Sequence, residues 1–316
     1  MVAAGEQVES AVEHQTARGI VVGVDGSPRA NNAVRWAARE AVMRRTPLTL
    51  AHVLTKPVAS RLGWTFSTAP LPADFGKWEQ DEQARRLLDE AMKLVEDDAE
   101  DSGPPEVNGQ VSTTGPVFSS AVSALVDLTE EAEMIVVGSR AQPGALRSLL
   151  GSVGTGLVHH AHCPVAVIPD HDPDELAASQ APVLVGVDGS PASESATAIA
   201  FDEAVWRGVD LVALHAWSDV DVADSPTEDW SAIESNAQEN LAKWLAPGRE
   251  RHPDATVRPV VVPDQPARHL LAQSEDAQLV VVGSRGRGGF AGAVLGSVST
   301  ALVHGTHAPV IVARDT

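Results

Sequence analysis

The chain has 316 residues, enough for two domains of ordinary size that each bury a hydrophobic core. Its 43 acidic and 23 basic residues give a formal net charge of −20, which opposes binding to nucleic acid or to an anionic membrane. The sequence contains no block of Lys and Arg that would offset this charge, so we expect neither partner.

The cysteine content and the first residues bear on the cellular compartment. The single cysteine, Cys163, cannot form a disulfide within the chain, which fits a reducing compartment, and we expect the cytoplasm. Residues 1–17 include Glu6, Glu9 and Glu13 and no apolar run, so we expect a flexible tail there and neither a signal peptide nor a membrane span.

The sequence repeats itself. Residues 20–52 align with 183–215 at an offset of 163, and 15 of these 33 positions are identical. Residues 151–168 align with 296–313 at an offset of 145, with 11 of 18 identical. The offsets differ by 18 residues, so the first copy carries 18 additional residues. Much of this extra sequence falls in the Pro-, Gly- and Ser-rich stretch 57–77, which is predicted as a surface loop.

The repeat defines the predicted domains. The first covers residues 18–169 and the second residues 182–316. Between them, residues 170–181 are rich in Asp and Pro and are predicted as a linker.

Short apolar runs alternate with amphipathic stretches in each copy. The strands predicted in the first copy are Ile20–Val24, Leu48–Leu54, Val107–Ser112, Met134–Val137 and Val165–Ile168. The helices predicted between them are Pro28–Arg45, Trp78–Asp98, Val117–Glu131 and Leu149–His160. Near-continuous Val, Ile and Leu runs such as Leu279–Val282 are typical of strands buried on both faces, so the alternation predicts an α/β fold with an open, doubly wound parallel sheet in each domain.

Two helices have a clear start signal. Ser27-Pro28 and Ser190-Pro191 each combine a capping serine with a proline at the first helical position. Helix capping by itself explains these pairs.

A glycine-rich segment follows the fourth strand of the second copy. It reads Gly-Ser-Arg-Gly-Arg-Gly-Gly over residues 283–289, and Gly296-Ser297 begins the next helix. Glycine lets backbone N–H groups approach a phosphate without a Cβ in the way, and a helix N-terminus adds unpaired N–H donors. Arg285 and Arg287 add cationic donors in an acidic chain, so we predict a phosphate site here.

Its place in the predicted sheet agrees with this interpretation. Ligands of open parallel sheets bind beyond the carboxyl ends of the strands, where the strand order reverses. The loops after the first strand, at Asp25 and Asp188, and after the fourth, at Gly138 and Gly283, are expected to meet there.

The spacing Gly283-x2-Gly286-x9-Gly296-Ser297 resembles the ATP-binding pattern of the universal stress protein family. The resemblance extends to Gly-Val-Asp-Gly-Ser after the first strand, to His215-Ala216 and to the closing His-x-Pro-Val strand, and it covers residues 20–313. It implies a tandem member of the ATP-binding subclass, with two Rossmann-like (adenine nucleotide alpha hydrolase-like) domains. Each would be an open five-stranded parallel sheet with helices on both faces, and the last strands would pair the domains.

The resemblance further implies one ATP per domain, with Mg²⁺ as an accompanying ion. In the second domain the implied residues are Gly186, Asp188, Ala216, Asp219, Val282, Gly283, Ser284, Arg285, Gly286, Arg287, Gly288, Gly296, Ser297 and Val298. In the first they are Gly23, Asp25, Val53, Gly138, Ser139, Arg140, Ala141, Gly144, Gly151, Ser152 and Val153. Asp25 and Asp188 could position Mg²⁺, or serve adenine and the loop geometry without a metal.

Other chemistries are less well supported. His159, His160, His162 and Cys163 include zinc-ligand types, but Ala308 replaces the cysteine in the second copy, and we favour a structural role at a helix end. No nucleophile, base or paired-carboxylate motif appears, so we expect no enzyme beyond slow ATP hydrolysis.

The leading hypothesis is therefore an ATP-dependent regulator or sensor in a stress or dormancy response, a setting that the resemblance implies. A weak ATPase or nucleotidyl-transfer enzyme and a dimeric scaffold without nucleotide remain alternatives. We expect a homodimer with an unidentified protein partner.

The first domain departs from the pattern, which leads to a prediction. Ala141 stands at the position of Gly286, and Gln142-Pro143 at that of Arg287-Gly288. An alanine forced to positive φ costs about 1–2 kcal/mol, and Pro143 removes an N–H donor. We expect the first site to bind ATP more weakly, tenfold for each ~1.4 kcal/mol lost. Titration of each half with ATP measures this, and equal affinities would contradict it.

Overall fold

The computed structural model describes residues 19–54, 77–97, 107–113, 121–141, 148–170, 180–217, 230–287 and 295–315. The tail predicted over residues 1–17, nearly all of the predicted loop at 57–77 and most of the predicted linker lie outside the described residues.

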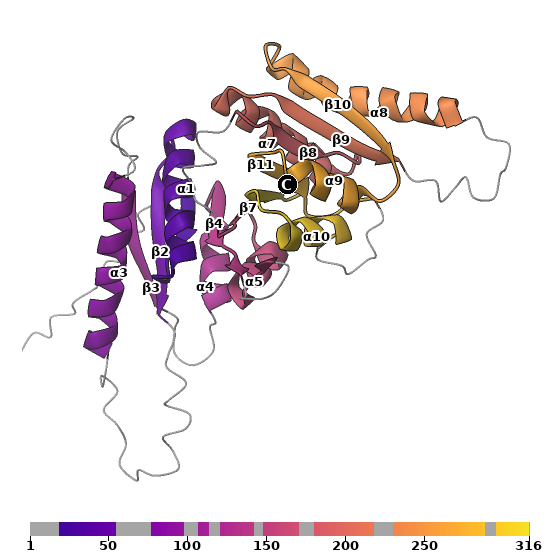
Figure 1. Ribbon diagram of the computed structural model, residues 1–316. Helices are drawn as coiled ribbons and strands as arrows, with labels where there is room; N and C mark the ends of the chain where they lie inside the picture. The colour runs from indigo at the N-terminus through magenta and orange to yellow at the C-terminus, as the bar shows by residue number, and fades with distance from the viewer. Residues whose placement is uncertain are drawn as a thin grey trace, which may run out of the picture.

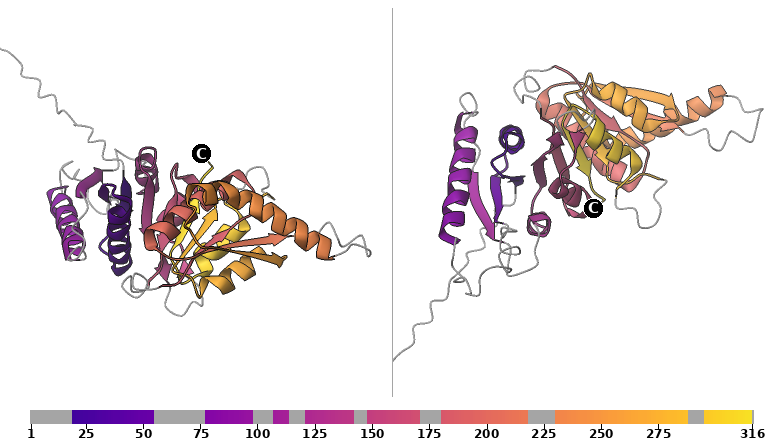
Figure 2. Two further views of the ribbon diagram at one scale, coloured as in Figure 1. Left: turned by 90° about the horizontal axis from the view of Figure 1, so that it is seen from above. Right: turned by 60° about the horizontal axis from the view of Figure 1, so that its bottom comes forward.

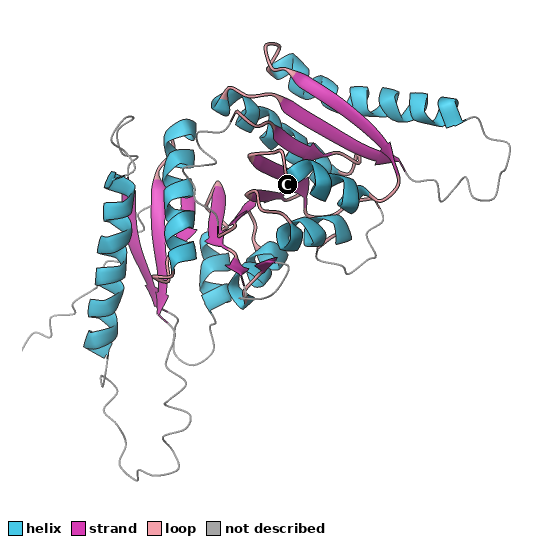
Figure 3. Cartoon of the chain, in the orientation of Figure 1, coloured by secondary structure: helices cyan, strands magenta, loops and turns pink. Residues whose placement is uncertain are grey.

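Ten strands form one continuous sheet (Figures 1 and 3). The first domain contributes β1 (Ile20–Gly23), β2 (Leu48–Leu54), β3 (Val107–Thr113), β4 (Met134–Gly138) and β7 (Val165–Ile168). The second contributes β8 (Val183–Gly186), β9 (Leu211–Trp217), β10 (Val257–Pro263), β11 (Leu279–Gly283) and β12 (Val310–Ala313). The strand order is β10-β9-β8-β11-β12-β7-β4-β1-β2-β3, parallel within each domain and antiparallel only between β12 and β7. The expected five-stranded parallel sheets, joined through their last strands, are confirmed.

Helices cover both faces of this sheet (Figure 2). On one face lie α1 (Pro28–Arg44), α3 (Lys77–Asp97), α7 (Pro191–Arg207) and α8 (Trp230–Arg251). On the other lie α4 (Ala121–Leu128), α5 (Ser152–His160), α9 (Pro266–Ser274) and α10 (Ser297–Gly305). The α/β fold predicted from the alternation is confirmed.

Strand side chains alternate between two cores. In β4, Met134 and Val136 pack with α1, whereas Ile135 and Val137 pack in the cluster that includes Leu157 of α5. All four β4 side chains are buried, so both faces of the strand are removed from water. This double burial explains the uninterrupted apolar runs in the sequence.

The predicted elements match the observed ones within a few residues, with one local error. Leu149 was predicted to begin a helix, but it lies in β6 (Ser148–Leu149), which pairs with β5 (Arg140–Ala141). The helix α5 begins only after Gly151, whose extended backbone (φ −62°, ψ 168°) forms the N-cap.

The capping serines are confirmed. Ser27 Oγ accepts a hydrogen bond from Ala30 N–H at 3.2 Å, and Ser190 Oγ accepts one from Ser193 N–H at 3.3 Å. Helices α1 and α7 therefore have first turns closed by their own side chains.

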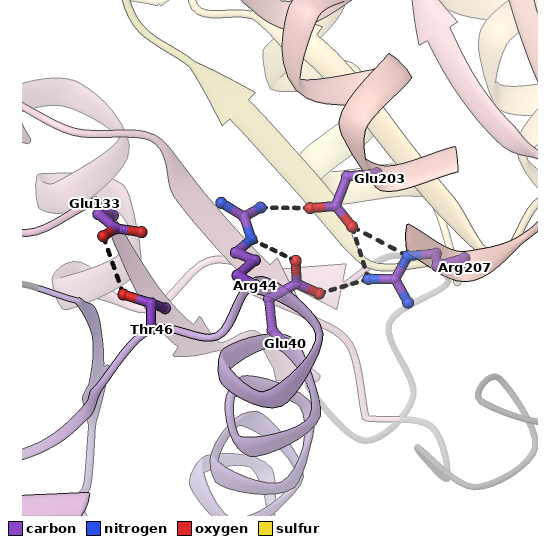
Figure 4. A network of polar contacts seen from close by, with 6 residues as sticks. All are labelled: Glu40, Arg44, Thr46, Glu133, Glu203 and Arg207. Atoms are coloured by element: carbon purple, nitrogen blue, oxygen red, sulfur yellow. Dashed lines mark hydrogen bonds and ion pairs between the residues drawn. The ribbon is translucent and has the colours of Figure 1, made fainter. Parts of the chain in front are cut away.

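The two domains also meet through a buried ring of four charges (Figure 4). Arg44 Nε donates to Glu40 at 2.7 Å, Arg207 Nη2 donates to Glu40 at 2.6 Å and Arg207 Nε donates to Glu203 at 3.0 Å. Arg44 also pairs with Glu203. Glu40 and Glu203 are equivalent in the repeat, as are Arg44 and Arg207, so the ring follows the internal two-fold relation of the domains.

Burial and mutual proximity move the pKa values of the two carboxyl groups apart. Burial and the neighbouring Glu40 carboxylate raise the pKa of Glu203 to about 8. Burial also opposes ionisation of Glu40, but Arg207, the hydrogen bond with Glu203 and Arg44 together lower the pKa of Glu40. The two carboxyl groups therefore differ in their tendency to hold a proton.

Removing one member of the ring should be costly. We expect Glu40→Ala to lower the free energy of unfolding by about 3–5 kcal/mol, because it leaves two buried arginines with Glu203 as their one remaining carboxylate in the ring. The measurement is urea unfolding of the full chain. Glu82→Ala is the matched control, since Glu82 forms an exposed i,i+4 pair with Arg86 at 3.6 Å and its loss should cost below about 1 kcal/mol. Equal losses in the two variants would contradict the structural role of the ring.

The raised pKa of Glu203 predicts a pH dependence. The folded chain keeps a proton on this group that the unfolded chain, at the ordinary pKa of 4.5, releases. Stability should therefore fall as the pH rises from 4.5 to about 8. Below pH 4.5 the lowered pKa of Glu40 acts in the opposite sense, so stability is lost as Glu40 is protonated. Unfolding of wild type and Glu203→Gln across this range isolates the effect, and identical profiles would count against it.

Candidate functional site

A large cavity opens at the carboxyl edge of the second-domain sheet. Its volume is about 930 Å³, which is within the range of small-molecule sites. It lies where the ends of β8, β9 and β11 meet the first turns of α9 and α10 and one side of α8. The lining residues are Gly186, Val187, Asp188, Ser193, Leu214, His215, Ala216, Trp217, Ile233, Asn236, Ala237, Asn240, Pro266, Leu270, Val282, Gly283, Arg285, Gly286, Arg287, Leu295, Gly296, Ser297, Val298 and Ser299.

The end of β11 approaches helix α7 closely. A Cβ on Gly283 would lie 2.7 Å from the backbone carbonyl carbon of Ala192. The equivalent Gly138 faces the backbone of Arg29 in the same way, at 2.6 Å. These two glycines are required by helix packing, independently of any ligand.

The helix that faces the glycine loop begins without a side-chain cap. Gly296 is the N-cap of α10 and Gly151 that of α5, and neither provides a side-chain hydrogen bond. The first backbone hydrogen bond within α10 runs from the Thr300 N–H to the Gly296 carbonyl. The backbone N–H groups of the turn before Thr300 therefore have no acceptor within the helix. These amides, together with the positive end of the helix dipole, make this wall of the cavity suited to an anion.

Asp188 connects the loop after β8 to the glycine loop. Its Oδ1 accepts hydrogen bonds from Ser190 N–H at 2.9 Å and from Ser190 Oγ at 2.6 Å. Its Oδ2 accepts the backbone N–H of Arg287 at 3.1 Å. Asp188 thus bridges the two loops, and its proposed roles toward Mg²⁺ or adenine stay predictions.

The close approach at Asp188 also corrects the reason for a glycine at position 286. Gly286 is not among the positive-φ glycines of the described chain, so the strain expected at positive φ does not apply. Instead, a Cβ on Gly286 would lie 2.5 Å from Asp188 Oδ2. Glycine is needed here because the loop passes against a carboxylate, and a side chain would push them apart.

The two arginines of the loop have different partners. Arg285 forms an ion pair with Asp315 at 2.7 Å, close to the C-terminus. The guanidinium of Arg287 stacks over the ring of Trp244 on α8, 4.7 Å from the ring centroid. Both arginines line the cavity, which is otherwise set in a strongly acidic chain.

His215 closes the inner wall of the cavity. Its Nδ1 lies 2.8 Å from the Val187 carbonyl oxygen, and His52 makes the same contact with Val24 at 2.7 Å in the first domain. Burial lowers the pKa of His215, and Arg287 adds to this effect, so the imidazole is neutral at neutral pH. His215 therefore orders the strand ends without adding a charge to the site.

The equivalent first-domain cavity is smaller, about 200 Å³. The predicted residues among its lining are Gly23, Asp25, Val53, Gly138, Ser139, Gly151, Ser152 and Val153. Arg140 and Ala141 form strand β5, and Gly144 lies outside the described residues. In the second domain, helix α8 also lines the cavity.

The second-domain residues predicted from the sequence come together except for three. Asp219 and Gly288 lie outside the described residues, and Ser284 is buried without lining the cavity. The sequence reasoning missed the wall formed by Ile233, Asn236, Ala237 and Asn240 of α8. Their i, i+3, i+4, i+7 spacing is the signal that one helix face is directed at the site.

No group of three or more His, Cys, Asp or Glu residues suited to a metal is found in the described part of the chain. Cys163 is buried, and burial raises the pKa of its thiol to about 12. A thiol that stays protonated is a poor metal ligand and a poor nucleophile, which agrees with a structural role for this cysteine.

Comparison with known proteins now identifies the family. The model of the universal stress protein family matches residues 16–169 and again residues 181–314. The chain belongs to the universal stress protein family. It is of the tandem type, with one family domain in each half.

Individual universal stress proteins are similar over nearly the whole chain. One from Mycobacterium tuberculosis strain H37Rv is 52% identical over 297 residues, covering 94% of this chain and 96% of the relative. A second from the same strain is 48% identical, with 94% and 97% covered. The crystal structure of a universal stress protein from Archaeoglobus fulgidus superposes with a TM-score of 0.68 at 21% identity, covering 95% of this chain and 99% of that one, which supports the fold. Within the described residues, no helix has the length and apolar character to cross a bilayer.

Proposed function

We propose that this universal stress protein binds ATP, most strongly in its second domain, and acts as a nucleotide-dependent regulator in a stress or dormancy response. The observation that carries the proposal is the second-domain cavity, which combines an apolar end with an amide-rich end. The proposal includes a cytoplasmic location, a homodimer and an unidentified protein partner.

The apolar end suits adenine and ribose. Leu214, Ala216 and Leu270 line the cavity, as does Trp217 at the end of β9. Asp188 lines the same cavity and accepts the Arg287 backbone N–H, and we expect its carboxylate to face the adenine and ribose.

The opposite end suits the phosphates. The loop from Gly283 to Arg287 and the first turn of α10 face one another, held together by the hydrogen bond from Gly296 N–H to the Ser284 carbonyl at 2.7 Å. Backbone amides, the α10 dipole and the Arg287 side chain can share the negative charge of a polyphosphate. Mg²⁺ bound with ATP would supply further charge neutralisation, and Asp188 and Asp25 line their respective cavities as carboxylates that could hold it.

The described residues suggest retention of the nucleotide. His215 is neutral and directs Nδ1 at a backbone carbonyl, and Asp188 already accepts three hydrogen bonds. Neither is arranged to activate a water molecule. Sustained phosphate release above ~0.1 s⁻¹ would favour the enzyme alternative instead.

A matched pair of variants tests the proposal. Ser297 and Ser152 are equivalent in the repeat, begin α10 and α5, and are both exposed. A glutamate at either position places negative charge where a phosphate would bind, and it suits the helix dipole, so folding should be preserved.

We expect ATP at 100 times its dissociation constant to stabilise the wild-type protein by about 2.7 kcal/mol. Ser297→Glu should remove most of this stabilisation, and Ser152→Glu should remove less because the first site is the weaker one. Thermal unfolding with and without ATP measures both, and mass spectrometry identifies nucleotide released from the purified protein. Absence of both bound nucleotide and stabilisation would leave the scaffold alternative.

A further inference from the structure

Helix α8 contributes an aromatic platform to the second site. The Trp244 ring lies under the Arg287 guanidinium at 4.7 Å and meets the His215 ring edge-on, with centroids 5.1 Å apart. A cation over an aromatic face is attracted by the ring quadrupole. Arg287 of the glycine loop is thus held by Trp244, which lies 43 positions away in the sequence.

The loop after β8 is shaped to admit this stack. Gly189 has φ +74°, and a Cβ there would lie 2.4 Å from the Trp244 ring and 2.7 Å from Arg287 Nη2. The backbone N–H of Arg287 is meanwhile fixed by Asp188. Backbone and side chain of Arg287 are therefore held by separate partners, and both contacts require the present path of the loop.

The first domain lacks both members of the stack. Gly26, the counterpart of Gly189, has φ +77° and faces Leu87, whose Cδ2 would be 2.5 Å from an added Cβ. Leu87 thus stands where the second domain has Trp244. At the repeat offset of 145, Gln142 of the first domain aligns with Arg287. This equivalence comes from the sequence.

We propose that Trp244 is a positioning residue that holds Arg287 at the phosphate end of the second cavity and gives this site its preference for a polyphosphate over a nucleoside. The proposal rests on nucleotide binding at this site. Stacking engages the flat face of the guanidinium, and its N–H donors lie in the plane and remain suited to phosphate oxygens. A long side chain ordered before the ligand arrives loses less conformational freedom on binding.

The experiment compares ATP with adenosine by titration calorimetry on the full chain. All proteins carry Ser152→Glu, so that the second site is followed alone. The variants are Trp244→Leu and Arg287→Gln, which install the first-domain residues, their combination, and Trp244→Phe, which keeps an aromatic face.

Trp244→Leu should weaken ATP binding roughly threefold to tenfold and change adenosine binding less than twofold. Because the tryptophan acts through the arginine, the double variant should bind ATP no more weakly than Arg287→Gln alone. Trp244→Phe should retain most of the ATP affinity. The melting temperature of the Trp244→Phe variant, compared with that of the parent, shows whether the fold is intact.

Three results would overturn the positioning role. They are an equal loss of ATP and adenosine affinity in Trp244→Leu, additive losses in the double variant, and a loss in Trp244→Phe as large as that in Trp244→Leu. The parent protein is titrated with ATP before any variant at position 244 is made. If it binds no ATP, the proposed function fails and the positioning role fails with it.

Discussion

The antiparallel pairing of β7 with β12 joins two independent parallel sheets into one, and the positions of both cavities follow from it. Val165–Val167 pair with Val310–Val312, and these residues are buried on both faces of the sheet. Without this pairing, each five-stranded sheet would expose an apolar edge strand, which is an aggregation hazard. The same pairing turns the carboxyl ends of the two sets of strands toward opposite edges of the composite sheet, so the two cavities do not share walls formed by strand ends.

The charged ring of Glu40, Arg44, Glu203 and Arg207 supplements this pairing on one face. Arg44 also lies over the Trp206 ring at 5.0 Å, and Arg207 lies over the Trp36 ring at 5.9 Å. Buried ion pairs are weak evidence for net stability, but they penalise any arrangement that separates the partners. We therefore interpret the ring as setting how α1 and α7 meet, in addition to the pairing of the buried apolar strands β7 and β12.

Duplication preserved the frame of each domain and changed the walls of the site. The capping serines, the His-to-carbonyl contacts and the uncapped starts of α5 and α10 occur in both halves. The long helix after the second strand differs most, because α8 lines its cavity and carries Trp244, whereas α3 presents Leu87 to the equivalent glycine. The two halves thus share their strand ends and helix starts and differ in the helix that follows the second strand.

The strands of the main sheet, most helix bounds, the two-fold repeat and the glycine-rich segment that lines the second cavity could be predicted from the sequence. Each of these depends on local spacing: apolar runs, Ser-Pro starts, and glycines between a strand and a helix. The packing of the folded chain shows what the glycine at 286 avoids, which arginine stacks on α8 and why the pKa values of Glu40 and Glu203 shift in opposite directions. These features join residues that are distant along the chain, and no periodicity encodes which side chains will be neighbours once the helices pack on a common sheet.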